Sequence, residues 1–107
     1  MIAKYVQLGD SIDYRPTTDV AAGDLVIVGE IVGVAKLDIP ANTLGALALT
    51  GIYDIAKISV TITQGEIVYW DASNKKITNI ATDNTAVGVC VLTSDATAET
   101  ARIRIGG

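Results

Sequence analysis

Short apolar segments separated by turn-forming residues run through almost the whole chain, and this spacing limits the fold more than any other feature. In AAGDLVIVGEIVGVA, residues 21–35, two apolar segments flank the Gly29-Glu30 pair. The stretch is shorter than the roughly 20 residues of a membrane-spanning helix. Many short apolar segments with frequent turn signals are typical of β sandwiches and barrels. The sequence therefore predicts an all-β fold, either a small β-barrel or a related compact β fold.

The strands are expected where apolar, β-branched residues cluster. One segment, IYDIAKI at residues 52–58, has weak helical character instead. With 107 residues, the chain is long enough to fold around a single core. The core must be aliphatic, because the chain contains no Phe. The expected strands are residues 11–14, 24–28, 31–36, 45–50, 67–70, 76–80, 86–93 and 101–105.

Part of the sequence occurs twice. Residues 23–27 (GDLVI) align with 65–69 (GEIVY), 31–35 (IVGVA) with 86–90 (AVGVC), and 47–49 (LAL) with 103–105 (IRI). The order of the blocks is kept, which predicts two similar halves, residues 20–55 and 62–107, within one β domain over residues 20–107. The acid that follows the first glycine of each copy, Asp24 or Glu66, is expected to close a turn, since short polar side chains do so.

The C-terminal segment ARIRI alternates strictly between apolar and basic residues. A half-buried strand has this period of two, so Ile103 and Ile105 are expected in the core, with Arg102 and Arg104 on the opposite face. The arginines then face either solvent or a partner. A second local pattern, WDASNKKIT, predicts a hairpin that turns at Ser73-Asn74.

The residue types needed for most enzymatic chemistry are missing or scattered. The chain has no His, the commonest general base and metal ligand. The acids lie in turn-like contexts, and Cys90, the single cysteine, lies in an apolar segment without a histidine partner. We therefore expect no catalytic, cofactor or metal site, and no enzyme.

The charge and hydropathy of the chain bear on which classes of partner it is expected to bind. The 12 acidic and 8 basic residues give a net charge of −4 and are spread along the chain. Nucleic-acid binding needs clustered Lys and Arg, so no nucleic acid is expected. No basic segment followed by a hydrophobic one begins the chain, so neither a leader nor a membrane contact is expected.

The first 19 residues are more polar than the rest, which indicates an extended N-terminal arm. Such an arm can add as a strand to the sheet edge of a partner; a frayed terminus or an ordinary edge strand is the alternative. Tyr69 and Trp70 are adjacent, so on a strand they point to opposite faces, and one of them is expected to be exposed. The alternative places one of the two rings in the core and the other over the rim of the barrel. If the exposed ring contacts a partner, Trp70 is a candidate interface residue, together with Arg102 and Arg104.

Several segments, taken in order, resemble the head-decoration or capsid cement proteins of phages and prophages. The segments are AKYVQLGDSIDY, DVAAGDLVIVGEIVGVA, IPANTLGALALTGIYDI, QGEIVYWDASNKKIT, AVGVCVL and ARIRI. The resemblance implies a small all-β domain similar to a β-clip or β-tulip fold. It also implies a protein made in the bacterial host cytoplasm that binds the capsid exterior, with the major capsid protein as partner and a homotrimer as the expected assembly.

By position, the resemblance assigns the capsid-facing arm to Lys4, Tyr5, Val6 and Gln7, followed by Tyr14 and Arg15. Such a protein stabilises the head by bridging capsid subunits. A phage tail, tube or other self-assembling β module would share the composition and is the alternative.

Overall fold

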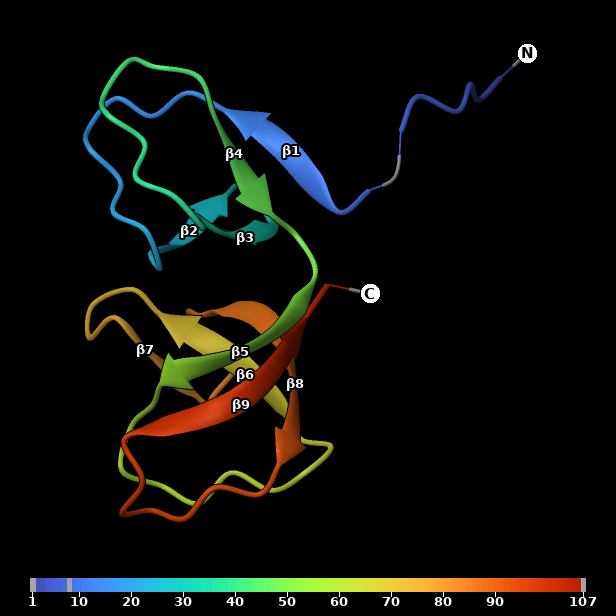
Figure 1. Ribbon diagram of the computed structural model, residues 1–107. Coiled ribbons are helices and arrows are strands. Elements are labelled where there is room, and N and C mark those ends of the chain that lie inside the picture. The colour runs from blue at the N-terminus through green and yellow to red at the C-terminus, as the bar shows by residue number, and fades with distance from the viewer. Residues whose placement is uncertain (1, 8, 107) are drawn as a thin grey trace. The chain divides into compact units, whose positions relative to one another are not determined.

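The computed structural model of the chain describes residues 2–7 and 9–106, and every regular element in these residues is a strand (Figure 1). This confirms the all-β prediction. No helix in the described residues is long and apolar enough to cross a membrane. The strands are β1 (Ser11–Tyr14), β2 (Leu25–Val28), β3 (Ile31–Val34), β4 (Gly45–Ala48), β5 (Gly51–Ala56), β6 (Ile67–Asp71), β7 (Lys76–Thr78), β8 (Thr85–Leu92) and β9 (Thr100–Ile105).

The strands form two antiparallel sheets. The four-stranded sheet has the order β1-β4-β3-β2, and the five-stranded sheet has the order β5-β9-β8-β6-β7. In the five-stranded sheet, a single parallel bridge between Lys57 and Ile77 links the end of β5 to the other edge strand. Both sheets are open, so the fold is a small β fold without a closed barrel.

The contacts within the chain group into two compact units, Met1–Leu49 and Thr50–Gly107. The four-stranded sheet lies in the first unit and the five-stranded sheet in the second. The division expected from the sequence, an arm over residues 1–19 and one β domain over residues 20–107, stays a prediction. β1 is part of the first sheet, and residues 2–7, which precede it, belong to no strand.

The segment with weak helical character is a strand. β5 pairs with β9 over its whole length, from Gly51 opposite Ile105 to Ala56 opposite Thr100. These pairings between residues far apart in sequence outweigh a weak local preference. The helical alternative for residues 52–58 is therefore wrong.

The core of the second unit follows the alternation in β9. Ile103 and Ile105 are buried, and Arg102 and Arg104 are exposed, as the ARIRI pattern predicted. Gly88 on β8 allows the strands to approach, since a Cβ there would overlap the carbonyl of Arg104. The largest fully buried side chains of this unit are Ile62, Val68, Ile77, Cys90, Ile103 and Ile105.

The core of the first unit is smaller. Ala35, Ile39 and Leu47 are buried together. A Cβ on Gly45 would lie 2.7 Å from Cδ1 of Ile39, so glycine at this position makes room for the isoleucine. Half-buried apolar residues cover this cluster, namely Ile12, Tyr14, Val20, Val26 and Val28.

The two units share one pattern of strand pairing. In the first, β2 pairs with β3 and β3 with β4, through Leu25–Val34 and Val34–Ala48. In the second, β6 pairs with β8 and β8 with β9, through Ile67–Val89 and Val89–Arg104. β1 and β5 complete the pattern by pairing with β4 and β9. The residues named in the β2–β3–β4 and β6–β8–β9 pairings occupy equivalent positions in the aligned sequence blocks. β7 is the extra strand of the second unit.

Candidate binding surfaces

The acids that open each sequence copy are turn residues. A carboxylate oxygen of Asp24 accepts a hydrogen bond from the backbone N–H of Ala21 at 3.0 Å, and Glu66 accepts one from Thr63 at 3.0 Å. The glycine before each acid has a φ of 91°, which residues with a Cβ rarely adopt. The structural role predicted for both acids is confirmed.

The hairpin predicted at Ser73-Asn74 joins β6 and β7. The carboxylate of Asp71 accepts hydrogen bonds from the backbone N–H of Ser73 and from the side chain of Asn74, at 3.0 and 2.7 Å. The hydrogen bonds from Asn74 lower the pKa of Asp71. The left-handed position is Lys75, with a φ of 54°, one residue later than the sequence indicated.

A charged side chain, that of Lys57, is buried in the interior of the second unit. Lys57 is 3% exposed, and its Nζ donates hydrogen bonds to the backbone carbonyls of Val60 and Ile58 at 2.7 and 3.3 Å. It thereby holds the loop after β5. Cys90 is also buried, and its Sγ lies 3.1 Å from the carbonyl oxygen of Leu92. No group of three or more His, Cys, Asp or Glu in residues 2–7 and 9–106 is placed to hold a metal ion.

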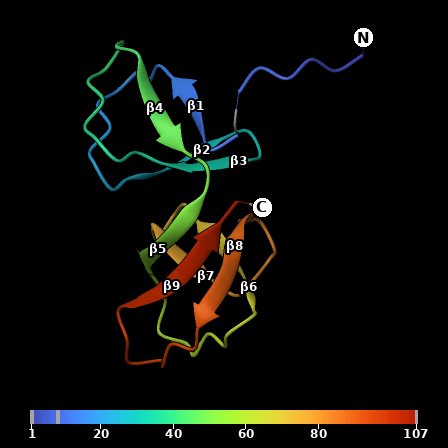
Figure 2. The ribbon, with the colours of Figure 1, turned by 45° about the vertical axis from the view of Figure 1, so that its right-hand side comes forward.

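The N-terminal arm is extended and exposed. Residues 2–7, which we call the arm, belong to no strand, and Figures 1 and 2 show their course up to the N-terminus. The side chains of Ile2, Tyr5 and Val6 are 108%, 76% and 82% exposed. Gln7 donates one long hydrogen bond, 3.4 Å, to the carbonyl of Ser11. The arm thus presents apolar side chains and backbone groups outside any sheet.

Two residues that the sequence grouped with the arm belong to the fold itself. Tyr14 is half-buried on β1 and packs against the core of the first unit. Arg15 is exposed, and its Nη1 donates a 2.8 Å hydrogen bond to the carbonyl of Asn42. The structure therefore separates both from the exposed residues Lys4, Tyr5, Val6 and Gln7.

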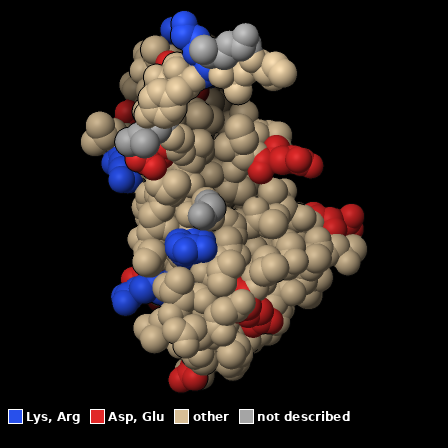
Figure 3. Space-filling view, turned by 90° about the vertical axis from the view of Figure 1, so that its right-hand side faces the viewer, with Lys and Arg blue, Asp and Glu red and all other residues tan. Residues whose placement is uncertain are grey.

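A second exposed surface covers the outer face of the five-stranded sheet. The register places Ile52, Arg104, Val89 and Ile67 in one row across β5, β9, β8 and β6. Directly opposite residues in antiparallel strands share a face. Ile52 and Ile67 are 57% and 53% exposed, and Figure 3 shows basic side chains set in a largely uncharged surface.

The next row of this face contains an ion pair. Nε of Arg102 lies 3.1 Å from a carboxylate oxygen of Asp54, and both side chains are about half exposed. The hydrogen bond and the charge of Asp54 raise the pKa of Arg102. Leu92 pairs with Arg102 from β8 and is exposed. The outer face therefore combines apolar side chains with two arginines.

Trp70 lies on the other side of this sheet. It is three residues after Ile67 along β6, so its side chain points to the face opposite Ile67 and Arg104. Tyr69 and Trp70 are both half-buried, so the expectation that one of them is exposed is wrong. Trp70 therefore does not join Arg102 and Arg104 in one surface.

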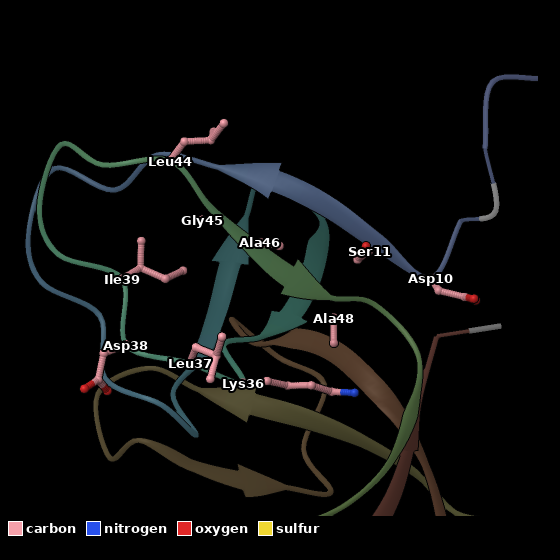
Figure 4. Close-up of a pocket in the computed structure, with 10 residues that line it drawn as sticks. All are labelled: Asp10, Ser11, Lys36, Leu37, Asp38, Ile39, Leu44, Gly45, Ala46 and Ala48. Carbon is pink, nitrogen blue, oxygen red and sulfur yellow. The ribbon is translucent and has the colours of Figure 1, made fainter.

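A cavity of about 470 Å³ opens beside β4 in the first unit (Figure 4). It is lined by β4 together with Asp10 and Ser11 at the start of β1, and by Leu44 and residues 36–39, which follow β3. Leu37 and Leu44 on its border are exposed. The sequence does not predict this cavity, because the cavity depends on where the pairing of β3 with β4 ends.

Comparison with known proteins identifies the family. A family model described as phage cement protein matches residues 6–105. The chain belongs to the phage cement protein family. No curated protein and no solved structure matches the chain at a significant level.

Membership of the phage cement protein family confirms the resemblance found in the sequence, and the match extends over both units of the fold. Cement proteins are structural components associated with the phage capsid. In this cement protein, the arm and the outer face of the five-stranded sheet are exposed surfaces that carry apolar side chains.

Proposed function

We propose that the protein binds the exterior of a phage head and stabilises the head by bridging subunits of the major capsid protein. It is made in the cytoplasm of the bacterial host and assembles as a homotrimer on the head. The observation that carries the proposal is the arm, which offers exposed apolar side chains and backbone outside any strand to a neighbouring chain.

The arm suits strand addition to the sheet edge of a capsid subunit. Backbone hydrogen bonds give such a contact its affinity, and alternate side chains give it specificity. Tyr5 and Val6 are adjacent, so in an added strand their side chains face opposite sides. Lys4 is the only charged residue among residues 2–7 and adds an electrostatic contact.

The outer face of the five-stranded sheet supplies a second proposed contact. Arg102 already has Asp54 as a partner, whereas Arg104 lies in a row with apolar neighbours. Arginine set among apolar side chains is typical of interface hot spots. Two separate contact surfaces on one chain would allow it to touch more than one subunit.

Co-sedimentation with undecorated, expanded phage heads tests the proposal. The comparison is between the full chain and a chain lacking residues 2–7, a deletion that leaves β1 intact. Saturable binding of the full chain alone supports decoration through the arm. Saturable binding of both chains supports decoration and assigns the capsid contact to the sheet face. No binding of either chain, with tubes or rings formed by the protein alone, overturns decoration in favour of a tail or tube module.

A further inference from the structure

The cavity beside β4 occurs where the shared strand pattern is incomplete. In the second unit, β8 continues past Cys90 and pairs with β9 again at Leu92–Arg102. In the first unit, the equivalent pairing would join Leu37 to Ala46, but the described pairing of β3 with β4 ends at Val34–Ala48. Leu37 and Ala46 both line the cavity. We call this opening, bounded by Ala46 and Leu37, the β4 slot.

The backbone of Ala46 is oriented to accept a strand in the slot. The N–H of Leu49 donates to the carbonyl of Asp10 at 2.8 Å. In an antiparallel ladder, the backbone N–H and C=O groups of successive residues point to opposite sides of the strand. The backbone groups of Leu47 therefore also point towards β1, whereas those of Ala48 and Ala46 point away from β1. Ala48 meets Val34 of β3 on that side. The register between β3 and β4 pairs no residue of β3 with Ala46, and Ala46 is exposed.

The arm has the chemistry that the slot requires. Its six described residues span roughly 20 Å when extended, which is longer than the four residues of β4. Tyr5 and Val6 face opposite sides of an added strand, so one of these two apolar side chains can contact Leu37, which is exposed on the border of the slot. Lys4 is its only charge, and the lining of the slot contains two acids, Asp10 and Asp38, and one base, Lys36, so the lining carries a net charge of −1 (Figure 4).

We propose that, in the protein before it meets a phage head, the arm of one copy adds as a strand to β4 in the slot of a second copy. The exchange covers apolar arm side chains that are otherwise exposed and gives the backbone of Ala46 a partner. The capsid then competes for the same arm. The proposal concerns the free protein and goes beyond capsid binding.

Disulfide trapping tests which chain fills the slot. A tagged V6C chain is mixed with an untagged L37C chain under mild oxidation, and a mixture of V6C with L92C serves as the control. Leu92 is also exposed and occupies the equivalent position in the second unit, where the ladder is already paired. The native Cys90 is buried. The proposal predicts several-fold more mixed dimer with L37C than with L92C.

Two outcomes would overturn the proposal. Equal yields of mixed dimer with L37C and L92C would show that the slot has no preference for the arm. A double variant, V6C/L37C, that crosslinks only within one chain would show that the arm fills the slot of its own copy. Sedimentation velocity supplies a second readout, in which the full chain should self-associate more strongly than the chain lacking residues 2–7. These measurements need no heads, so their failure is separate from a failure of capsid binding.

Discussion

Asp24 and Glu66 make the same hydrogen bond at equivalent positions of the two units, each to the backbone N–H three residues earlier and each at 3.0 Å. The backbone bonds around them also match, since Gly23 donates to Ala35 and Gly65 to Cys90, at 2.6 and 2.7 Å. The same turn structure therefore precedes β2 and β6. It is part of the scaffold that supports the proposed contact surfaces.

Removing the turn acid of the first unit should destabilise that unit. Asp24→Ala leaves the N–H of Ala21 without its side-chain acceptor, and we expect a loss of about 1 kcal/mol in the free energy of unfolding. Asp24→Asn keeps an acceptor oxygen and should lose less. Urea denaturation of the two variants and the parent chain measures the difference. Equal stability of Asp24→Ala and the parent would refute the role of the hydrogen bond.

Adding a methyl group at Gly88 should disrupt the packing of β8 against β9. The new Cβ would overlap the backbone carbonyl of Arg104, which cannot move as a flexible side chain can. We expect a loss of about 3 kcal/mol or more, at the upper end of overpacking effects. Gly9→Ala is the matched control, because a Cβ there has nothing within 4 Å. Thermal melts of both variants check the prediction, and a Gly88→Ala melt like that of Gly9→Ala would contradict it.

A charge in the core of the second unit should prevent folding. Val87 is 5% exposed, and Val87→Asp places a carboxylate in this buried interior, at a cost of several kcal/mol. Ile52→Asp is the control on the outer face, where the side chain is 57% exposed. Circular dichroism and heat denaturation distinguish the two. A cooperative melt of Val87→Asp at the parent temperature would show that the assigned core is wrong.

The hairpin between β6 and β7 should respond to acid through Asp71. Hydrogen bonds from Asn74 lower the pKa of Asp71 in the folded chain, so the carboxylate stabilises the fold at pH values above its pKa in the unfolded chain. This contribution is lost as the pH falls through the lowered pKa of the folded state. NMR titration should give Asp71 a pKa below the usual value for aspartate. In Asn74→Ala the pKa should return towards that value, and an unchanged pKa would contradict the assignment.

The sequence predicted well those features that depend on local chemistry. The alternation of Ile103 and Ile105 with the two arginines, the turns at Asp24 and Glu66, and most strand positions follow from side-chain period and turn preference. The position of β5 did not follow, because its six pairings with β9 join residues about fifty positions apart. The half-burial of both Tyr69 and Trp70 was not predicted, because it depends on packing across strands.

Other features of the candidate surfaces could be found only in the structure. Burial of Lys57 depends on the carbonyls of a loop that follows it. The slot depends on where one ladder ends, and the row that joins Ile52 to Arg104 depends on strand register. Register and loop path arise from contacts between distant residues, and a single sequence gives little information about them.

Binding to undecorated, expanded phage heads is the most direct test of the central claim. Full-length protein is added to heads over a range of concentrations, and the amount that sediments with the heads is measured beside the chain lacking residues 2–7. The cement function predicts saturation of the full-length protein at a fixed number of copies per head, and the proposed arm contact predicts weaker binding of the shortened chain. Absence of saturable binding by the full-length protein would contradict the function proposed for it.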